Sequence, residues 1–336
     1  MNSIIMKIVA SSSDKVSCYF FEQVEHKTSD RIVVLRAHEI IKIKLREKIV
    51  HSTSATIFRN GNLCIRMIHT PDSIGQNYTI NDFLDPLSAA VNDPNFELFK
   101  TSMFLCPNVP GVNVPIGIAH IATACGNSIV GTIHRWYAQS LEDYIEDQTA
   151  DGIFNAPESI LIIEKIANIL WDIQAAGYIH SDIKAGNILL DDNLEPVISD
   201  IDSFIPLGCL GECIGTAGHM SPEMMNCSHL GPETDTYAMA QLIYDILIDR
   251  PEGLYDYKKI KRSGYNIQGI VDQTEHALDS LKHIIINRPS GKDADEKHFG
   301  VAAKCIYKII THRAHDIRPL VAQLKSDISA IYGAQN

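Results

Sequence analysis

The stretch Tyr178-Ile179-His180-Ser181-Asp182-Ile183-Lys184-Ala185-Gly186-Asn187-Ile188-Leu189-Leu190 decides the fold of this chain. Its apolar end, Ile188–Leu190, and a second apolar pair, Val197–Ile198, flank the turn-forming Asp191-Asp192-Asn193, which predicts a β-hairpin. The hairpin carries Asp182, Lys184 and Asn187 on the loop that enters it and Asp200 on the loop that leaves it. Carboxylate and amide oxygens suit Mg²⁺, and an ammonium group beside them suits a phosphate. The pattern therefore indicates a metal and phosphate site at the open end of a small sheet.

Three segments in this region match known sequence motifs, and they match them in order and in spacing. His180, Ser181, Asp182, Ile183 and Asn187 occupy the positions of H-R-D-L-x-x-x-N, and Asp200-Ile201-Asp202 stands where D-F-G is expected. A third segment, Gly215-Thr216-Ala217-Gly218-His219-Met220-Ser221-Pro222-Glu223, resembles the one that ends in A-P-E. Together they resemble the protein kinase superfamily, in particular divergent eukaryotic-like Ser/Thr kinases of the kind used as bacterial effectors or by viruses. The alternative, an unrelated enzyme with a chance H-x-D loop, is disfavoured because all three motifs occur in order.

The resemblance implies an α+β, bilobal fold with a β-rich N-lobe and a mainly helical C-lobe. Residues 47–136 are expected to form the N-lobe, residues 137–336 the C-lobe, and residues 1–46 a β extension packed on the N-lobe. β-Branched and aromatic runs fill residues 1–70, and Arg59-Asn60-Gly61-Asn62 is a hairpin signal between two of them. The apolar spacing within Pro157–Ala176 predicts a buried helix that Gly177 ends. Residues 250–300 are too weakly patterned for an assignment.

The resemblance also implies transfer of the γ-phosphate of ATP, with Mg²⁺ as the metal. Asp182 would accept the proton of the substrate hydroxyl, Lys184 would steady the γ-phosphate, and Asn187 and Asp200 would hold Mg²⁺. Ser/Thr kinases usually have a lysine two residues after the catalytic aspartate, so serine or threonine is the expected acceptor. Asp202 replaces the glycine of D-F-G, where it is either a further Mg²⁺ ligand or a turn residue.

The nucleotide-handling features of the N-lobe depart from the family pattern. Where the family has a glycine-rich loop this chain has Ser52, Thr53 and Ser54, whose β-carbons keep the backbone further from a phosphate. Arg66 replaces the strand lysine and is not equivalent to it; a solvent-facing strand arginine is the alternative. Glu97 is the candidate partner of Arg66, with a free surface glutamate as the alternative. The adenine-binding hinge is expected at Ile133, His134 and Arg135, and it extends to Trp136.

Three other positions in the C-lobe acquire expected roles from the resemblance. Asp235 opens an apolar helix and resembles the aspartate that braces the catalytic loop. Arg318 resembles the arginine that pairs with the glutamate of A-P-E, here Glu223. Ser181 replaces the arginine that receives an activation-loop phosphate, so activation by such a phosphate is not expected.

Composition excludes several classes of protein. The chain has 336 residues, 45% of them hydrophobic and 21% charged, which is typical of a globular protein, and no apolar run is long enough for a membrane span. The eight cysteines form no C-x-x-C pair, which favours reduced thiols and a cytoplasmic location, or secretion into a host cell as an effector. A metal or redox site around Cys209, Cys213 and Cys227 matches no common zinc spacing. The net charge of −12 argues against nucleic acid and leaves room for a basic protein substrate. Nothing in the sequence indicates an oligomeric state.

Three functions remain open from the sequence. The first is an active Ser/Thr protein kinase, favoured by the intact polar set of Asp182, Lys184, Asn187 and Asp200. The second is a pseudokinase that acts as a nucleotide-binding or scaffold module, favoured by the missing glycines. The third is a small-molecule kinase on the same fold, which the Ser221-Pro222-Glu223 segment disfavours because that segment forms a peptide platform in the family.

Overall fold

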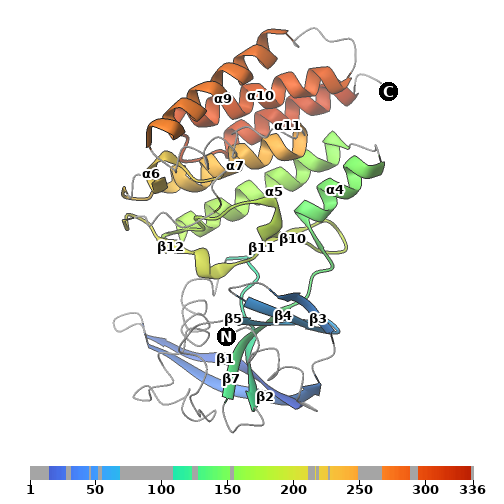
Figure 1. Cartoon of the computed structure of the whole chain (residues 1–336), viewed down its shortest axis with the longest axis vertical. Coiled ribbons are helices and arrows are strands. Elements are labelled where there is room, and N and C mark those ends of the chain that lie inside the picture. The colour runs from blue at the N-terminus through green and yellow to red at the C-terminus, as the bar shows by residue number, and fades with distance from the viewer. Residues whose placement is uncertain are drawn as a thin grey trace. The chain divides into compact units, whose positions relative to one another are not determined.

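The computed structural model describes residues 15–27, 32–44, 47–51, 55–68, 109–122, 128–151, 155–210, 216, 219–225, 228–248, 267–287 and 294–333. The chain divides into two compact units. Unit 1 comprises Met1–Asn108 with Asn113–Tyr137, and unit 2 comprises Val109–Val112 with Ala138–Asn336. Unit 1 contains a β-sheet and unit 2 is mainly helical (Figure 1), which confirms the predicted α+β class. The predicted division into 1–46, 47–136 and 137–336 remains a proposal.

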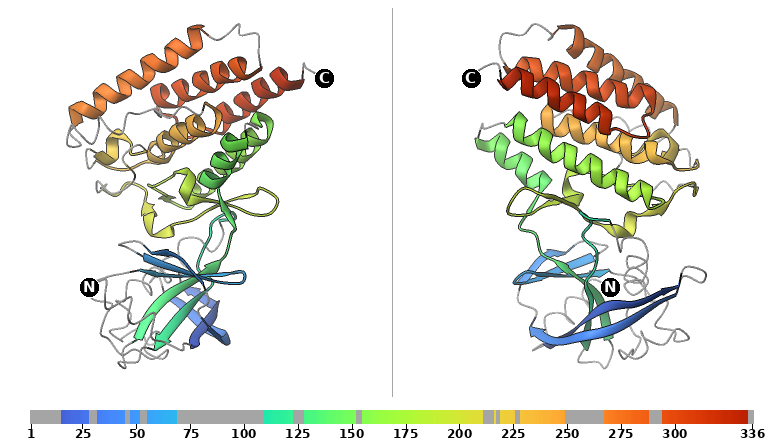
Figure 2. Two further views of the ribbon diagram at one scale, coloured as in Figure 1. Left: turned by 45° about the vertical axis from the view of Figure 1, so that its right-hand side comes forward. Right: turned by 180° about the vertical axis from the view of Figure 1, so that it is seen from behind.

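Unit 1 contains a seven-stranded sheet with the strand order β2-β1-β6-β7-β5-β4-β3, in which all neighbouring pairs that the register describes are antiparallel. Its strands are β1 (Lys15–Lys27), β2 (Ile32–Lys44), β3 (Glu47–His51), β4 (Ala55–Asn60), β5 (Leu63–Ile68), β6 (Gly117–Ala122) and β7 (Ser128–Arg135). The long hairpin of β1 and β2 extends the sheet beside β6 (Figure 2).

Local sequence features explain one turn of this sheet and the length of one of its strands. The Asn60-Gly61-Asn62 turn joins β4 to β5 as predicted, and Gly61 adopts a φ of +59°, which favours glycine. The sequence suggests two separate β-forming runs, Arg31–Leu35 and Ile40–Lys44, whereas the structure has one strand, β2, over Ile32–Lys44. No glycine, proline, asparagine or aspartate lies between these two runs to end the strand, so pairing with β1 continues through them. The sequence also predicts a short helix within Ile80–Val91 and a further helix from Pro94 to Leu105; both ranges lie outside the described residues.

Unit 2 is built on helices that pack against one another. They are α4 (Leu141–Asp151), α5 (Ala156–Ala175), α6 (Pro222–Met225), α7 (Pro232–Leu247), α9 (Ile267–Asn287), α10 (Ala294–His312) and α11 (Arg318–Gly333). Helix α5 packs against α7 and α11, and α10 packs against α7, α9 and α11 (Figure 1). Helices α9 and α10 cover much of the region that the sequence left unassigned. The spacing of the buried Ala277, Leu281 and Ile284 on α9 was a helical signal within it.

Helix α5 confirms the sequence prediction and forms the centre of the core of unit 2. The side chain of Asn155 accepts a hydrogen bond from the N–H of Glu158 at 3.2 Å, which caps its first turn. The predicted apolar face is buried throughout (Ile163, Ile166, Ala167, Leu170 and Ile173). Gly177 follows the helix at a φ of +89° and redirects the chain into β9 (Tyr178–Ile179). The helix thereby delivers the chain to the loop that begins at His180.

The predicted catalytic hairpin is also confirmed, as β10 (Ile188–Leu190) paired with β11 (Pro196–Ile198). The short strand β8 (Gln139–Ser140) pairs with the other edge of β10. On the β11 side, Ile198 donates its N–H to Gly111 O at 2.8 Å. Gly111 has a φ of +82°, and an added Cβ would lie 2.5 Å from Cδ1 of Ile169, so only glycine fits this approach to α5. Short 3₁₀ turns, Ala185–Asn187 and Ile201–Ser203, lie at the open end of the hairpin.

Candidate active site

The catalytic loop, defined here as residues 180–187, is fixed from inside the helical unit by Asp235. This fully buried carboxylate in the first turn of α7 accepts hydrogen bonds from the backbone N–H groups of His180 at 2.7 Å and Ser181 at 2.9 Å. Burial raises the pKa of Asp235, while the His180 ring and these two N–H groups oppose that rise. The predicted bracing contact is therefore present.

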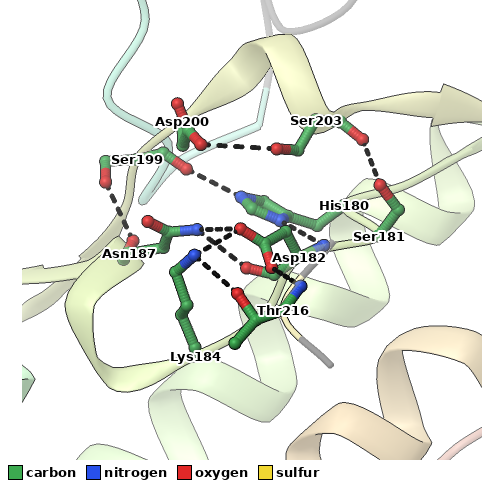
Figure 3. A network of polar contacts seen from close by, with 9 residues as sticks. All are labelled: His180, Ser181, Asp182, Lys184, Asn187, Ser199, Asp200, Ser203 and Thr216. Atoms are coloured by element: carbon green, nitrogen blue, oxygen red, sulfur yellow. Dashed lines mark hydrogen bonds and ion pairs between the residues drawn. The ribbon is translucent and has the colours of Figure 1, made fainter. Parts of the chain in front are cut away.

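His180 connects the two ends of the hairpin. Its Nε2 lies 2.7 Å from the carbonyl oxygen of Ser199, and its Nδ1 accepts the N–H of Asp182 at 3.2 Å (Figure 3). These contacts require a proton on Nε2 and a lone pair on Nδ1, which is a neutral imidazole. Burial lowers the pKa of His180, in keeping with that state, although nearby carboxylates oppose the effect. The ring therefore acts as a fixed spacer between the catalytic loop and the segment after β11.

Asp182 is held by donors on both of its carboxylate oxygens (Figure 3). Oδ2 accepts from Lys184 Nζ at 2.6 Å and from Asn187 Nδ2 at 3.0 Å, and Oδ1 accepts from the backbone N–H of Thr216 at 3.0 Å. Lys184 Nζ also donates to Thr216 Oγ1 at 2.8 Å. The structure thus brings Asp182, Lys184 and Asn187 together as the sequence predicted, and adds Thr216.

The electrostatics of this cluster keep Asp182 ionised. Burial alone would raise the pKa of Asp182, but the hydrogen bond and charge of Lys184 and the hydrogen bonds from Thr216 hold the pKa below its usual value. An ionised carboxylate with oriented oxygens is able to accept a proton from a hydroxyl group placed beside it.

The two residues expected to hold Mg²⁺ flank this cluster. Asn187 Nδ2 donates to the backbone oxygen of Asp182 at 2.8 Å, so its amide oxygen is turned away from that residue (Figure 3). Asp200 follows β11 at a φ of +64°, a conformation that costs energy for a residue with a side chain, and its Oδ2 lies 3.4 Å from Ser203 Oγ. Asp202 is exposed on the 3₁₀ turn Ile201–Ser203.

The hard oxygen donors of Asn187 and Asp200 fit Mg²⁺, which proteins bind through one or two carboxylates together with substrate phosphates. Among the described residues no group of three or more His, Cys, Asp or Glu side chains is placed to bind a metal by itself. Cys213 and Cys227 lie outside these residues, while Cys209 is exposed. The role of Asp202 as a ligand remains a prediction.

The first part of the activation segment, which is defined as residues 200–223, is anchored by neutral groups. Near its start, Ile205–Pro206 (β12) pairs with β9, and Ser181 Oγ donates to Ser203 O at 2.5 Å. Further along, Gly208 N–H donates to Leu230 O at 2.9 Å. An apolar cluster buries Ile179, Met220, Met224 and Leu230, with Ile205 and Leu207 packed against it. Ser181 therefore makes an uncharged contact where the family has an arginine.

One predicted pairing at the end of this segment is wrong. Glu223 forms its ion pair with Arg313, which follows α10, and not with Arg318. Arg318 instead forms a bidentate pair with Asp316, through Nε at 2.9 Å and Nη2 at 2.8 Å, and stacks on Trp171 at 3.7 Å from the ring centroid. Two near partners therefore satisfy the guanidinium of Arg318, while Arg313, at a φ of +48°, directs its side chain to Glu223.

The expected adenine hinge lies in β7. Ile133 is fully buried and its carbonyl oxygen accepts from the N–H of Ile116 at 2.7 Å, while the N–H of Trp136 donates to Asn62 O at 2.9 Å. The His134 ring is buried, with Nδ1 3.2 Å from Asn113 O and Nε2 2.9 Å from Thr132 Oγ1, and the Arg135 side chain is exposed. Backbone groups at both ends of this segment are thus bonded within the sheet.

The other predicted nucleotide residues are only partly described. Arg66 is half-exposed on β5, opposite Ile57 of β4 and Thr132 of β7. Ser52, Thr53, Ser54 and Glu97 lie outside the described residues, so the proposed pairing of Arg66 with Glu97 remains a prediction.

Sequence reasoning gave no role to Thr216 or His219. The Gly-Thr pair ahead of the Ser-Pro-Glu sequence was the available signal for Thr216, because a hydroxyl and a backbone N–H at that place can both reach the catalytic loop. His219 donates its backbone N–H to Thr216 O at 2.8 Å. Burial lowers the pKa of His219 to about 4, with Asp182 opposing and Lys184 reinforcing the shift, so its ring is neutral near pH 7.

No helix in the described parts of the chain combines the length and apolar character that a membrane crossing requires.

Comparisons with known proteins agree with this geometry. The family model described as "Protein kinase domain" matches residues 131–314, more than half of the chain. A serine/threonine-protein kinase of Corynebacterium efficiens is 31% identical over 33% of this chain and 22% of its own length. The serine/threonine-protein kinase PknD of Chlamydia abortus is 26% identical over 50% of this chain and 20% of its own. The gamma catalytic chain of mouse phosphorylase b kinase is 29% identical over 33% of this chain and 29% of its own. The chain thus matches less than a third of the length of each relative.

The braced catalytic loop, the carboxylate cluster at Asp182 and the family match over residues 131–314 lead to one conclusion: the chain belongs to the protein kinase family.

Proposed function

We propose that this chain is a Ser/Thr protein kinase, which transfers the γ-phosphate of ATP to a serine or threonine hydroxyl of a protein. The observation that carries the proposal is the Asp182 carboxylate, oriented by Lys184, Asn187 and Thr216 and held ionised by them. A protein scaffold without chemistry has no need of three donors that fix one carboxylate. The names of the Corynebacterium and Chlamydia relatives, both serine/threonine-protein kinases, support the acceptor class.

In this mechanism Asp182 accepts the proton of the substrate hydroxyl as its oxygen attacks the γ-phosphorus, and the bond to the β-phosphate oxygen breaks to release ADP. Lys184, 2.6 Å from Asp182 Oδ2, lies where its ammonium group can also offset negative charge on the transferred phosphoryl group. Thr216 fixes the distance between the activation segment and the catalytic loop, and so positions the hydroxyl beside Asp182. When bound at Asn187 and Asp200, with Asp202 as a further candidate, Mg²⁺ would neutralise phosphate charge.

Two observations favour a second candidate, a pseudokinase that binds partners without catalysis. The N–H of Trp136 and the carbonyl oxygen of Ile133 are already bonded within unit 1, and the segment of residues 51–55 contains no glycine. Both features weaken the case for ATP binding by backbone groups: the hinge groups already have partners, and the loop lacks the glycines that allow its backbone to approach the phosphates closely. A small-molecule kinase on the same fold is the third reading.

The experiment is transfer of labelled phosphate from Mg·ATP to a generic basic protein, with nucleotide binding followed in parallel by calorimetry. Transfer by the wild type that Asp182→Asn abolishes, with ATP affinity retained, is the expected result. Nucleotide binding without transfer to itself or to any protein would establish the pseudokinase, and transfer to metabolites alone would establish the third reading.

A further inference from the structure

A cavity of about 130 Å³ lies within unit 2, between α6, the first turns of α7 and the end of α10. Its apolar walls come from Pro222, Tyr237, Ile309 and Ile310. An engineered protein cavity of about 150 Å³ takes up benzene, so this one has room for a ligand of about five non-hydrogen atoms. It is too small for a nucleotide, and the proposed phosphoryl transfer does not use it.

Two carboxylates line the same cavity, and both are largely removed from water. The side chain of Glu223 is 14% exposed and that of Glu233 is 18% exposed. Glu223 pairs with Arg313, which also lines the cavity, so these two charges cancel. The one ion-pair partner of Glu233 in the described structure is His315, whose Nε2 lies 3.5 Å away on a side chain that is 70% exposed and is charged only when protonated. The lining of the cavity therefore has one negative charge in excess.

The helix terminus holds Glu233 at this place. A Cβ on Gly231 would lie 2.4 Å from Oε2 of Glu233, so a larger residue at position 231 would displace the carboxylate. Glu233 also lies in the first turn of α7, where the unpaired backbone N–H groups favour a negative charge. Position and charge of Glu233 are thus set locally, and the carboxylate stays available to a cation from outside the chain.

Thr236 adds a second acceptor on the same side of α7. Its hydroxyl is buried and donates to Ala314 O at 2.7 Å. A hydroxyl has one proton and two lone pairs, and in the described parts of the chain no group donates to Thr236 Oγ1. Residues 233 and 236 are one turn apart and therefore neighbours on the helix surface. An ammonium group, which has three protons and no lone pair, suits this pair of acceptors.

We propose that the cavity binds a small alkylammonium compound, with its ammonium group at Glu233 and Thr236 and its carbon chain against Tyr237, Ile309 and Ile310. A cation neutralises the excess charge of the lining and forms a charge-assisted hydrogen bond to a carboxylate that is mostly withdrawn from water. A neutral alcohol of the same length fills the space without neutralising this charge, and a carboxylic acid anion is repelled by it.

The position of the cavity gives such a ligand a structural effect. One wall belongs to α6 at the end of the activation segment, and another belongs to the turn of α7 that contains Asp235, the brace of the catalytic loop. A compound that binds this arrangement and not the unfolded chain stabilises it by mass action. The ligand thereby ties the end of the activation segment to the helix that supports the catalytic loop.

The test is a titration of the full chain, with its isoleucine methyl groups labelled for NMR, by three probes of nearly equal size at constant pH and ionic strength. The probes are n-butylammonium chloride, n-butanol and sodium butyrate. The methyl signals of Ile309 and Ile310 should shift saturably with n-butylammonium, with a Kd of about 1–10 mM, which is reasonable for five non-hydrogen atoms. n-Butanol should bind at least about fivefold more weakly, and butyrate should not bind.

Two variants locate the charge that selects the probe. Glu233→Gln keeps the shape of the side chain and should raise the Kd of n-butylammonium about fivefold, with the Kd of n-butanol unchanged. His315→Lys places a permanent ammonium group beside Glu233 and should weaken n-butylammonium binding by a similar factor. Their matched controls are Glu275→Gln and His276→Lys, the same changes at exposed positions on α9, which should leave both values unchanged.

Each outcome decides the inference. Saturable shifts that favour the cation, weakened by the two cavity variants and by neither control, support it. Equal affinity for n-butylammonium and n-butanol, tighter binding of butyrate, the absence of a saturable shift at Ile309 and Ile310, or equal weakening in variants and controls overturns it. The titration needs no nucleotide and no phosphoryl transfer, so its result is independent of the kinase proposal.

Discussion

In the catalytic loop His180, Asp182, Lys184 and Asn187 each form a side-chain hydrogen bond of 3.0 Å or less, whereas the ends of the expected adenine hinge are bonded within unit 1. The two regions face different physical demands. A catalytic loop works only if particular donors meet particular oxygens, so few residue types are acceptable at each position. A sheet needs only β-forming residues in alternation and suitable turns, which many sequences supply. In agreement, the family model begins at residue 131, near the end of the sheet.

The largest effect is expected from the catalytic loop. Replacing Asp182 with Ala removes the proposed proton acceptor and should lower kcat by about 10²–10⁴-fold. Nucleotide affinity should change little, because Asn187 and Asp200, the groups proposed to bind Mg²⁺, remain. Single-turnover transfer and an ATP titration measure the two quantities, and full activity in the variant would contradict the assignment of Asp182.

The next effect concerns the support beneath the loop. Asp235→Asn keeps the shape of the side chain but replaces one acceptor oxygen with an NH₂ group. The backbone N–H of either His180 or Ser181 then loses its acceptor. The free energy of unfolding should fall by about 1–3 kcal/mol, and the displaced loop should lower kcat by about 10²-fold. Chemical denaturation and steady-state kinetics test both values. Unchanged kcat in a folded variant would mean that the loop holds its geometry without this brace.

A smaller effect is expected in the pH dependence. In the wild type the pKa of Asp182 is lowered, so this carboxylate contributes stability above its usual value of 3.8, and that contribution is lost as the pH falls through the lowered pKa. Lys184→Met removes the charge and the hydrogen bond that lower the pKa of Asp182, so burial should raise this pKa. The acid limb of the pH profile of kcat should then move to higher pH. Lys165→Met removes an exposed ion pair and is the matched control. A pH–rate profile checks the shift, and an acid limb common to both variants would contradict this account.

The smallest effect concerns the sheet. Gly61→Ala places a side chain at a φ of +59° with nothing within 4 Å of the new Cβ, so only backbone strain of about 1 kcal/mol is expected. The control is Gly333→Ala on α11, which also meets no neighbour but does not have a positive φ. Thermal denaturation should separate the two variants, while phosphoryl transfer stays at the wild-type level. A loss of transfer in Gly61→Ala would show that this turn, whose Asn62 oxygen binds Trp136, takes part in catalysis.

Several elements could be predicted because their signals are local. The hairpin of β10 and β11 follows from two apolar runs around an Asp-Asp-Asn turn, and α5 follows from its apolar spacing and the glycine after it. The strand β2 was predicted as two runs because Arg36, His38 and Glu39 interrupt the apolar pattern, although pairing with β1 continues through them. Helices α9 and α10 were not predicted because only a few of their positions are buried, so the helical spacing of their apolar residues is hard to recognise among the polar ones.

The sequence by itself determined the order of the motifs and brought Asp182, Lys184 and Asn187 onto one short loop, while the bracing role of Asp235 was predicted from the resemblance that these motifs carry. Only the tertiary structure decided the partners of groups that have several equivalent choices. Thr216, 34 residues after Asp182, became its donor through the path of the activation segment. Arg313 and not Arg318 reached Glu223, since Asp316 and Trp171 hold the guanidinium of Arg318. A sequence gives the charge and reach of such side chains, but which partner lies within 3 Å depends on how distant elements pack.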